Sequence, residues 1–328
     1  MKKSFYIFLV FLFMLAGCKK QANLTEAKEI YVSKGLTGYI KYVRDSEQYF
    51  EFHDDKKYGA TPLLLAVRDC NLEAIDLFYK NGANLYQERD YNNNDFFDYL
   101  KNHTIQYFEQ IIDVIPSLYW SNSSTPDTMP IIRLLNNPNS SEYIQVLLEK
   151  DLIHPELDVG NDVSLLMYAA KNSNPEIVEK LCMKSISINT FNKRGLNAVM
   201  FAARYNPDKA VLDTLLQHGA SVEGNPFGFS LTMLAACNDN PGVLLAISKT
   251  EENLNKRTIK GKTALMYACE NCKTPDTIEI LINDFNEDVA AQDDEGKTAL
   301  DYLSSNKYFD GYNFTDFLKN EGKEDDNE

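Results

Sequence analysis

One short pattern recurs along this chain at a spacing of 33 residues, and it restricts the possible folds more than any other feature. The four most regular copies are Ser164–Ala170, Asn197–Ala203, Ser230–Ala236 and Thr263–Cys269. An anchor residue two positions before each copy keeps the same phase along the chain, at Gly59, Asn93, Asp127, Asp162, Gly195, Gly228, Gly261 and Gly296. A fixed period of this length predicts a solenoid in which one supersecondary unit is stacked on the next.

Each unit carries the signals of two helices. The residue two positions after the anchor can cap a helix N-terminus in seven of the eight units, Met129 being the exception. A second helix is predicted to open with an N-cap residue followed by proline at Asn174-Pro175, Asn206-Pro207 and Thr274-Pro275, because proline fits the first helical turn. Gly82 and Gly219 are predicted to end second helices in the left-handed conformation.

Several units resemble ankyrin repeats. The resemblance is carried by Tyr58–Ala66 with Lys80–Asn84, by Gly261–Ala268 and by Gly296–Asp301. It implies an all-α ankyrin-repeat solenoid over residues 28–320, with about eight helix-turn-helix units, hairpin-like loops and a cap at each end. The pattern is weak in the two units between 90 and 140. Glu29–Val43 is predicted as a helical partial first repeat, Asn313–Leu318 as the last second helix, and 321–328 as an acidic disordered tail.

The N-terminus has the pattern of a secretory signal. Lys2 and Lys3 precede an apolar run of 11 residues, Phe5–Leu15, which is too short to cross a bilayer as a helix. Leu15-Ala16-Gly17-Cys18 resembles the lipobox of bacterial lipoproteins, which implies cleavage of residues 1–17, lipidation of Cys18 and a short tether over 18–27. The alternative is an ordinary signal peptide or an N-terminal anchor with a chance cysteine.

The charge of the chain limits its partners and its contact with a membrane. The net charge of −15 becomes −17 once Lys2 and Lys3 are removed, so the protein repels nucleic acid and anionic lipid. We therefore expect membrane attachment through the lipid alone. Lys19, rather than aspartate, follows Cys18. This favours the outer membrane of the bacterial envelope, with the periplasmic and surface faces both left open.

The sequence contains no pattern typical of an enzyme, a cofactor site or a metal site. Four histidines are scattered, and no glycine-rich phosphate loop is present. Cys269-x-x-Cys272 is interpreted as a pair of small buried residues, although a disulfide within this pair or between repeats is an alternative. The methionine column at Met167, Met200, Met233 and Met266 is interpreted as packing, with copper(I) binding as the alternative. We expect no cofactor and no small-molecule substrate.

The loop tips and first helices of the fifth to seventh units form the candidate binding surface. These positions are the ones that ankyrin proteins vary for recognition, and here they combine basic with aromatic residues, as interface centres do. The predicted binding residues are Lys193, Arg194, Arg204, Tyr205, Phe227, Phe229, Lys260 and Lys262. We expect them to lie on the concave side and to bind a protein with an acidic patch. The sequence thus predicts a non-catalytic scaffold, or alternatively an inhibitor or immunity protein that caps a secreted enzyme or toxin.

Overall fold

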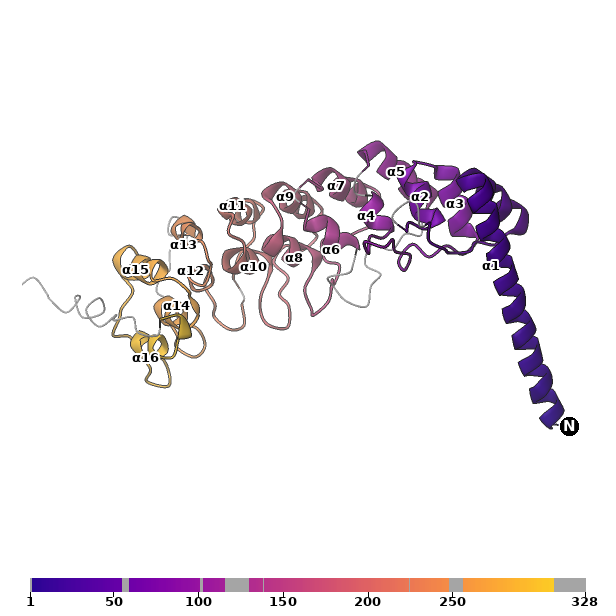
Figure 1. The fold of residues 1–328 in the computed structure, drawn as a ribbon. Coiled ribbons are helices and arrows are strands. Elements are labelled where there is room, and N and C mark those ends of the chain that lie inside the picture. The colour runs from indigo at the N-terminus through magenta and orange to yellow at the C-terminus, as the bar shows by residue number, and fades with distance from the viewer. Residues whose placement is uncertain are drawn as a thin grey trace, which may run out of the picture. The chain divides into compact units, whose positions relative to one another are not determined.

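The computed structural model describes residues 2–54, 59–100, 103–115, 130–137, 139–223, 225–247 and 256–309, with side chains from residue 23 onward. These residues form sixteen α-helices and a short 3-10 helix, and none of them lies in a β-strand (Figure 1). The predicted all-α fold is confirmed. The helices belong to two compact units, Met1–Tyr119 and Trp120–Glu328.

The first unit begins with α1 (Lys2–Ser46), which is interrupted at Gly35. The φ of 66° and ψ of −166° at Gly35 are accessible because glycine has no Cβ. The Tyr42 hydroxyl donates to the carbonyl of Asn23 at 3.4 Å, so the segment after Gly35 runs back beside the one before it. The predicted helical stretch Glu29–Val43 is therefore present, but as parts of two segments rather than one.

Two helix pairs follow in the first unit. They are α2 (Pro62–Arg68) with α3 (Leu72–Lys80), and α4 (Phe96–Leu100) with α5 (Ile105–Val114). Helix α2 packs on α4, while α3 packs between α1 and α5, so first and second helices form separate layers. The fully buried ring of Tyr39 on α1 closes this end of the core, with centroids 5.2 Å from Phe52 and 5.5 Å from Phe78.

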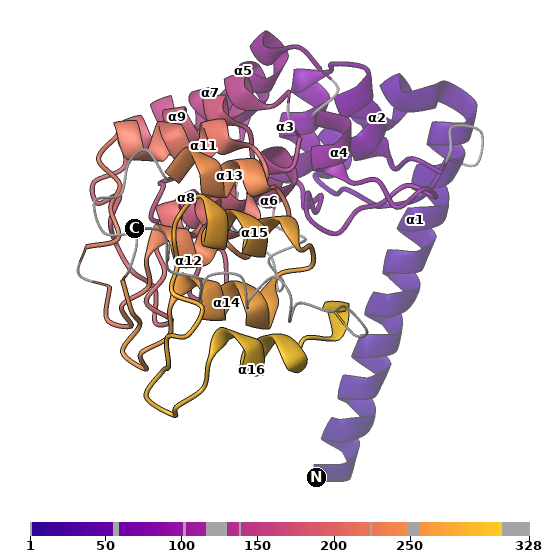
Figure 2. The same ribbon diagram turned by 90° about the vertical axis from the view of Figure 1, so that its left-hand side faces the viewer.

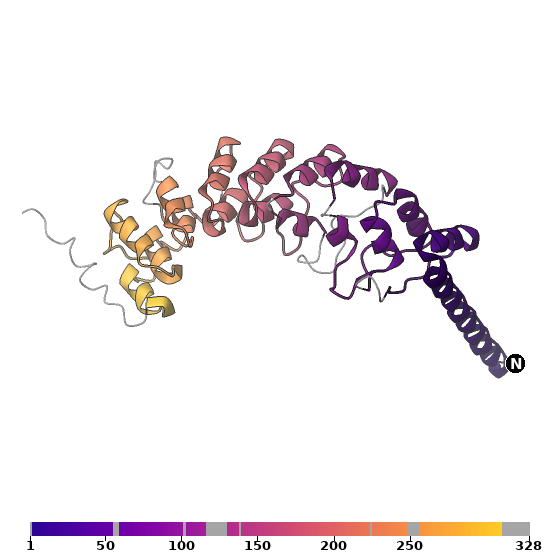
Figure 3. The ribbon, with the colours of Figure 1, turned by 45° about the horizontal axis from the view of Figure 1, so that its top comes forward.

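The second unit repeats the same pairing of helices. Its first helices are α6 (Pro130–Leu135), α8 (Leu165–Asn172), α10 (Ala198–Tyr205), α12 (Leu231–Ala235), α14 (Ala264–Asn271) and α16 (Ala299–Ser304). Its second helices are α7 (Ser141–Glu149), α9 (Pro175–Lys184), α11 (Lys209–Gln217), α13 (Pro241–Ile247) and α15 (Asp276–Asn283), and the 3-10 helix η2 is Lys307–Phe309. Successive members from α8 to α16 and from α7 to α15 pack on each other. The result is two layers, with long loops projecting beyond the first helices (Figures 1, 2 and 3).

Each of the eight first helices begins three residues after a predicted anchor. Side-chain caps explain this register, because the Ser164 hydroxyl accepts the Met167 N–H at 3.2 Å and the Asn197 amide oxygen accepts that of Met200 at 3.3 Å. The alanine column that includes Ala169 and Ala202 is buried and lets neighbouring first helices approach closely.

Two predicted starts of second helices are wrong. Asn174 does cap α9, but α11 begins at Lys209 and is capped by Asp208 rather than Asn206. Helix α15 begins at Asp276 and has no side-chain cap, so Thr274 does not serve as one. For Asn206 the reason is tertiary: its side-chain amide bonds the carbonyls of Ala170 and Ser173 in the preceding unit, each at 3.0 Å.

Each long loop has a tight turn at its tip, with the anchor in the left-handed conformation. In the fifth unit the Asn192 N–H donates to the Leu196 carbonyl at 2.9 Å and the Gly195 N–H to the Asn192 carbonyl at 2.8 Å. All seven anchors within the described residues have positive φ. At Gly195 a Cβ atom would lie 2.5 Å from the Phe227 ring, so the loops also stack closely.

Several predicted features lie outside the described residues. They are the anchor Asp127, the helix Asn313–Leu318, the tail 321–328 and the side chain of Cys18. Among the residues that the structure does describe, no helix combines the length and the apolar character that a membrane span needs.

Candidate protein-binding surface

The predicted binding residues lie on first helices and loop tips of the second compact unit, Trp120–Glu328, in the fifth to seventh repeats. Lys193 and Arg194 are exposed at one tip, where the Asn192 side-chain oxygen accepts the Arg194 N–H at 3.0 Å and fixes the turn. The Lys193 ammonium lies 3.6 Å from Asp162, an anchor of the preceding unit. Arg194 therefore presents its charge to solvent, whereas that of Lys193 is partly offset.

Arg204 and Tyr205 lie together at the end of α10. Tyr205 is 43% exposed, and its ring centroid is 5.4 Å from the Arg204 guanidinium carbon. A further cation, Lys171 at the end of α8, approaches the same ring with its ammonium 5.1 Å from the centroid. The structure thus adds Lys171 to the pair that was predicted from the sequence.

Phe227 and Phe229 form the aromatic part of the surface. Their ring centroids are 6.2 Å apart, and Phe229 meets the ring of Tyr267 edge to face at 5.6 Å. The Arg204 guanidinium also donates a hydrogen bond to the phenol of Tyr267. Tyr267 therefore joins the cationic part of the surface to its aromatic part. Its regular place in the repeat pattern gave no signal for this role.

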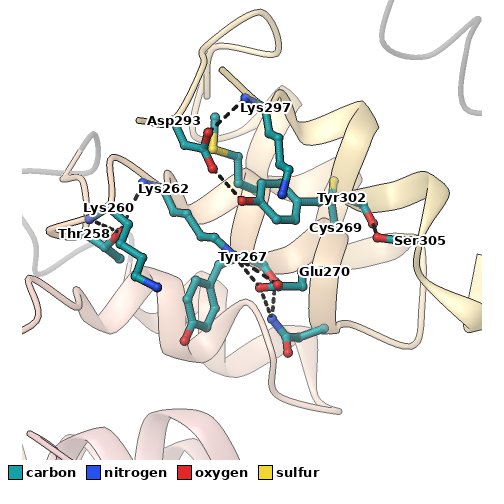
Figure 4. A network of polar contacts seen from close by, with 12 residues as sticks. Thr258, Lys260, Lys262, Tyr267, Cys269, Glu270, Asp293, Lys297, Tyr302 and Ser305 are labelled. Carbon is teal, nitrogen blue, oxygen red and sulfur yellow. Dashed lines mark hydrogen bonds and ion pairs between the residues drawn. The ribbon is translucent and has the colours of Figure 1, made fainter. Parts of the chain in front are cut away.

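Lys262 is not available as a free cation, although it was one of the predicted binding residues. Its ammonium lies 3.0 Å from both carboxylate oxygens of Glu270 and 4.0 Å from the centroid of the Tyr302 ring (Figure 4). The hydroxyl of Tyr302 donates in turn to Asp293. The Lys262 side chain is only 17% exposed, so it belongs to a contact network between the last repeats.

Lys260 is exposed at its loop tip, and the last repeat brings the negative charge of Glu295 near it. Its carbonyl accepts the Asp294 N–H at 3.2 Å, and its positive charge contributes to lowering the pKa of Glu295, after the larger effects of Lys297. The predicted basic stripe is therefore strongest in the fifth unit and is partly neutralised toward the seventh and eighth. The surface predicted from the repeat pattern comprises the fifth to seventh units alone and therefore leaves out these acidic residues of the last repeat.

Burial determines the charge state of the groups around Arg204. Burial raises the pKa of the Cys237 thiol to about 12, and it is also the main cause that raises the pKa of Tyr267. Both groups are neutral at pH 7. The Cys237 thiol and the Tyr267 phenol beside Arg204 thus add no negative charge that would offset its guanidinium.

The family comparison agrees with this architecture. The family model for ankyrin repeats, which spans three copies, matches residues 131–226 and 232–324, more than half of the chain. This chain belongs to the ankyrin-repeat family. Ankyrin repeats form protein-interaction scaffolds and are generally not catalytic.

A solved structure provides a further likeness to this ankyrin-repeat protein. It is described as a predatory endopeptidase from Bdellovibrio bacteriovorus in complex with an immunity protein, and the similar chain has 24% sequence identity. The match covers 58% of this chain and 97% of that chain, with a TM-score of 0.45.

The methionine column and the Cys269–Cys272 pair, which were the alternative sites in the sequence, are both part of the packed interior. The four methionines of the column are buried, and the sulfurs of Met200 and Met266 accept N–H groups of Asn225 and Thr263 at 3.6 and 3.5 Å. Cys269 is fully buried at the position that Ala170, Ala203 and Ala236 occupy in the preceding units. The described cysteines are free thiols, and no cluster of three metal-binding His, Cys, Asp or Glu side chains occurs within the described residues.

Proposed function

We propose that this protein is a non-catalytic protein-binding scaffold that a lipid on Cys18 tethers to a bacterial envelope membrane. The binding part of the proposal is supported by its ankyrin-repeat family and, above all, by the cationic and aromatic side chains that share one face of the fifth and sixth units. The tether is supported by Leu15-Ala16-Gly17-Cys18, and Lys19 after the cysteine favours the outer membrane.

The partner that fits this surface is a protein with an acidic patch. Arg194 and Arg204 carry positive charge in a chain whose net charge is −15, so an acidic partner gains attraction at this surface and meets repulsion over the rest of the molecule. Exposed portions of Tyr205 and Phe227 supply the apolar contact that interface centres favour. Screening acts within about 10 Å at 0.1 M salt, so binding should weaken as salt is added.

Affinity capture after crosslinking in cells tests this proposal. The full-length protein should retain a specific partner, and the pair Arg194→Glu with Arg204→Glu should weaken binding by about tenfold or more. The matched control is Lys180→Glu with Lys209→Glu on the second helices α9 and α11. The binding face is refuted if the control pair has the larger effect. A captured secreted enzyme or toxin would identify the scaffold as an inhibitor or immunity protein.

A further inference from the structure

Two cations that approach the Tyr205 ring have no carboxylate partner among the described residues. The Lys171 ammonium is 5.1 Å and the Arg204 guanidinium carbon 5.4 Å from the ring centroid, and the two side chains come from consecutive first helices. Other lysines of the second compact unit do form ion pairs, for example Lys273 with Asp239 at 2.7 Å and Lys262 with Glu270 at 3.0 Å. Like charges on one ring repel each other, and an anion placed beside them would relieve this repulsion.

The carboxylate of Glu270 does not offset the charge of Arg204. Its negative charge acts on Cys237 and Tyr267, which are neighbours of Arg204, but both of its oxygens lie 3.0 Å from the Lys262 ammonium (Figure 4). The Lys262–Glu270 pair is therefore neutral as a whole. The positive charge beside Tyr205 stays available to an external anion.

An exposed apolar surface adjoins the cations through Tyr267. Phe229 packs against Tyr267, and Phe227, which is 37% exposed, lies next to Phe229. Ile259 is 63% exposed on the following loop tip, and its N–H donates to the Phe227 carbonyl at 3.1 Å. Charged and apolar contacts are thus side by side on rigid, hydrogen-bonded elements.

We propose that this surface recognises a short acidic segment of a protein partner, with carboxylates beside Lys171 and Arg204 and a large apolar side chain against Phe227 and Phe229. The inference rests on the proposed scaffold function and narrows it from an acidic patch to a linear sequence that combines both features. A nucleic acid fits less well, because a polyanion meets the charge of −15 over the rest of the chain. A short segment places only a few charges where the cations are.

Selection from a library of random short peptides on the full-length protein tests the proposal. Retained peptides should be enriched in Asp or Glu together with a large apolar residue. For one such synthetic peptide, Lys171→Gln with Arg204→Gln should lower the affinity by about tenfold or more, measured by fluorescence anisotropy. Amide replacement of the peptide carboxylates should cause a similar loss, and the two changes combined should cost less than their sum because they remove one interaction.

The controls separate this proposal from the scaffold function on which it rests. Lys180→Gln with Lys209→Gln should leave affinity unchanged, and thermal melting should show that the Lys171 and Arg204 variant stays folded. Peptides without acidic enrichment, no retained peptide, or additive losses would each overturn the anion site. A partner captured in cells through another face would overturn it as well, while leaving the scaffold function intact.

Discussion

The side-chain amide of Asn238 donates a 2.8 Å hydrogen bond to the main-chain carbonyl of Asn206 in the preceding unit. The same amide bonds the carbonyl of Ala203 at 2.9 Å, and Asn206 makes the equivalent pair of bonds one unit earlier. Asn306 repeats this arrangement with Cys269 and Cys272. These asparagines form a buried ladder that satisfies carbonyls near the ends of first helices, where no intrahelical partner exists.

Asn238→Ala should destabilise the protein by about 2 kcal/mol or more, because it leaves two buried carbonyls without donors. Asn238 is only 5% exposed, so water cannot easily replace its amide. Urea unfolding followed by circular dichroism measures the change. Asn271→Ala is the matched control, since exposed Asn271 bonds only within its own helix and to Glu270. A loss as large in the control would contradict the special role of the ladder.

Cys272→Asn should stabilise the protein by about 1 kcal/mol. Cys272 occupies the ladder position of its unit but offers only a thiol, which bonds the nearby Thr274 carbonyl at 3.5 Å. An amide there should reach the carbonyls of Ala236 and Asn238, and asparagine is close to cysteine in size. Cys269→Asn, three residues earlier and fully buried, should instead destabilise it because no partner waits for the amide. If both variants lost the same amount of stability, Cys272 would not occupy the ladder position.

Stability should rise as the pH falls from about 7.5 to 5.5. Burial raises the pKa of Glu88 and that of Glu287 to about 7 each, although hydroxyls of Thr61 and Tyr49 donate to Glu88. The folded protein then binds protons that the unfolded chain, with a glutamate pKa of about 4.3, still lacks. The stabilisation is present at the acidic end of this window and is lost as the pH rises through 7, on the order of 2 kcal/mol for each carboxyl.

Urea unfolding of the wild type and of Glu287→Gln at several pH values checks this effect. The variant should show a smaller slope of stability against pH, whereas Glu223→Gln at an exposed position should keep the wild-type slope. A wild-type stability that increases with pH through this window would show that the sign is wrong.

Cys18→Ser should abolish lipidation and release the protein from the membrane. In the proposed tether the lipid attaches to the cysteine sulfur, and each buried methylene of an acyl chain contributes about 0.8 kcal/mol to membrane anchoring. Mass spectrometry of the mature N-terminus and membrane fractionation provide the measurements. An unmodified Cys18, or cleavage at another bond, would be incompatible with the proposed tether.

The period of the sequence was sufficient to predict the helix pairs. Thr61, Ser164 and Thr263 bond main-chain N–H groups only three residues away, so the starts of first helices are local and visible in the sequence. Positive φ at the anchors is local as well, because Gly195 or Gly261 determines its own backbone conformation. The stacking of the regular units then follows from their shared buried alanines.

Only the tertiary structure decided which polar side chains are available for binding. Asn206 resembles a helix cap in sequence, yet its amide bonds carbonyls 33 and 36 residues earlier. Lys262 resembles a binding residue, but Glu270 and Tyr302 hold its ammonium, while Lys171 and Arg204 meet at one tyrosine from separate units. These outcomes depend on distances between neighbouring repeats, because a charge is neutralised by whatever group packs beside it, and the periodic pattern does not encode those side-chain positions.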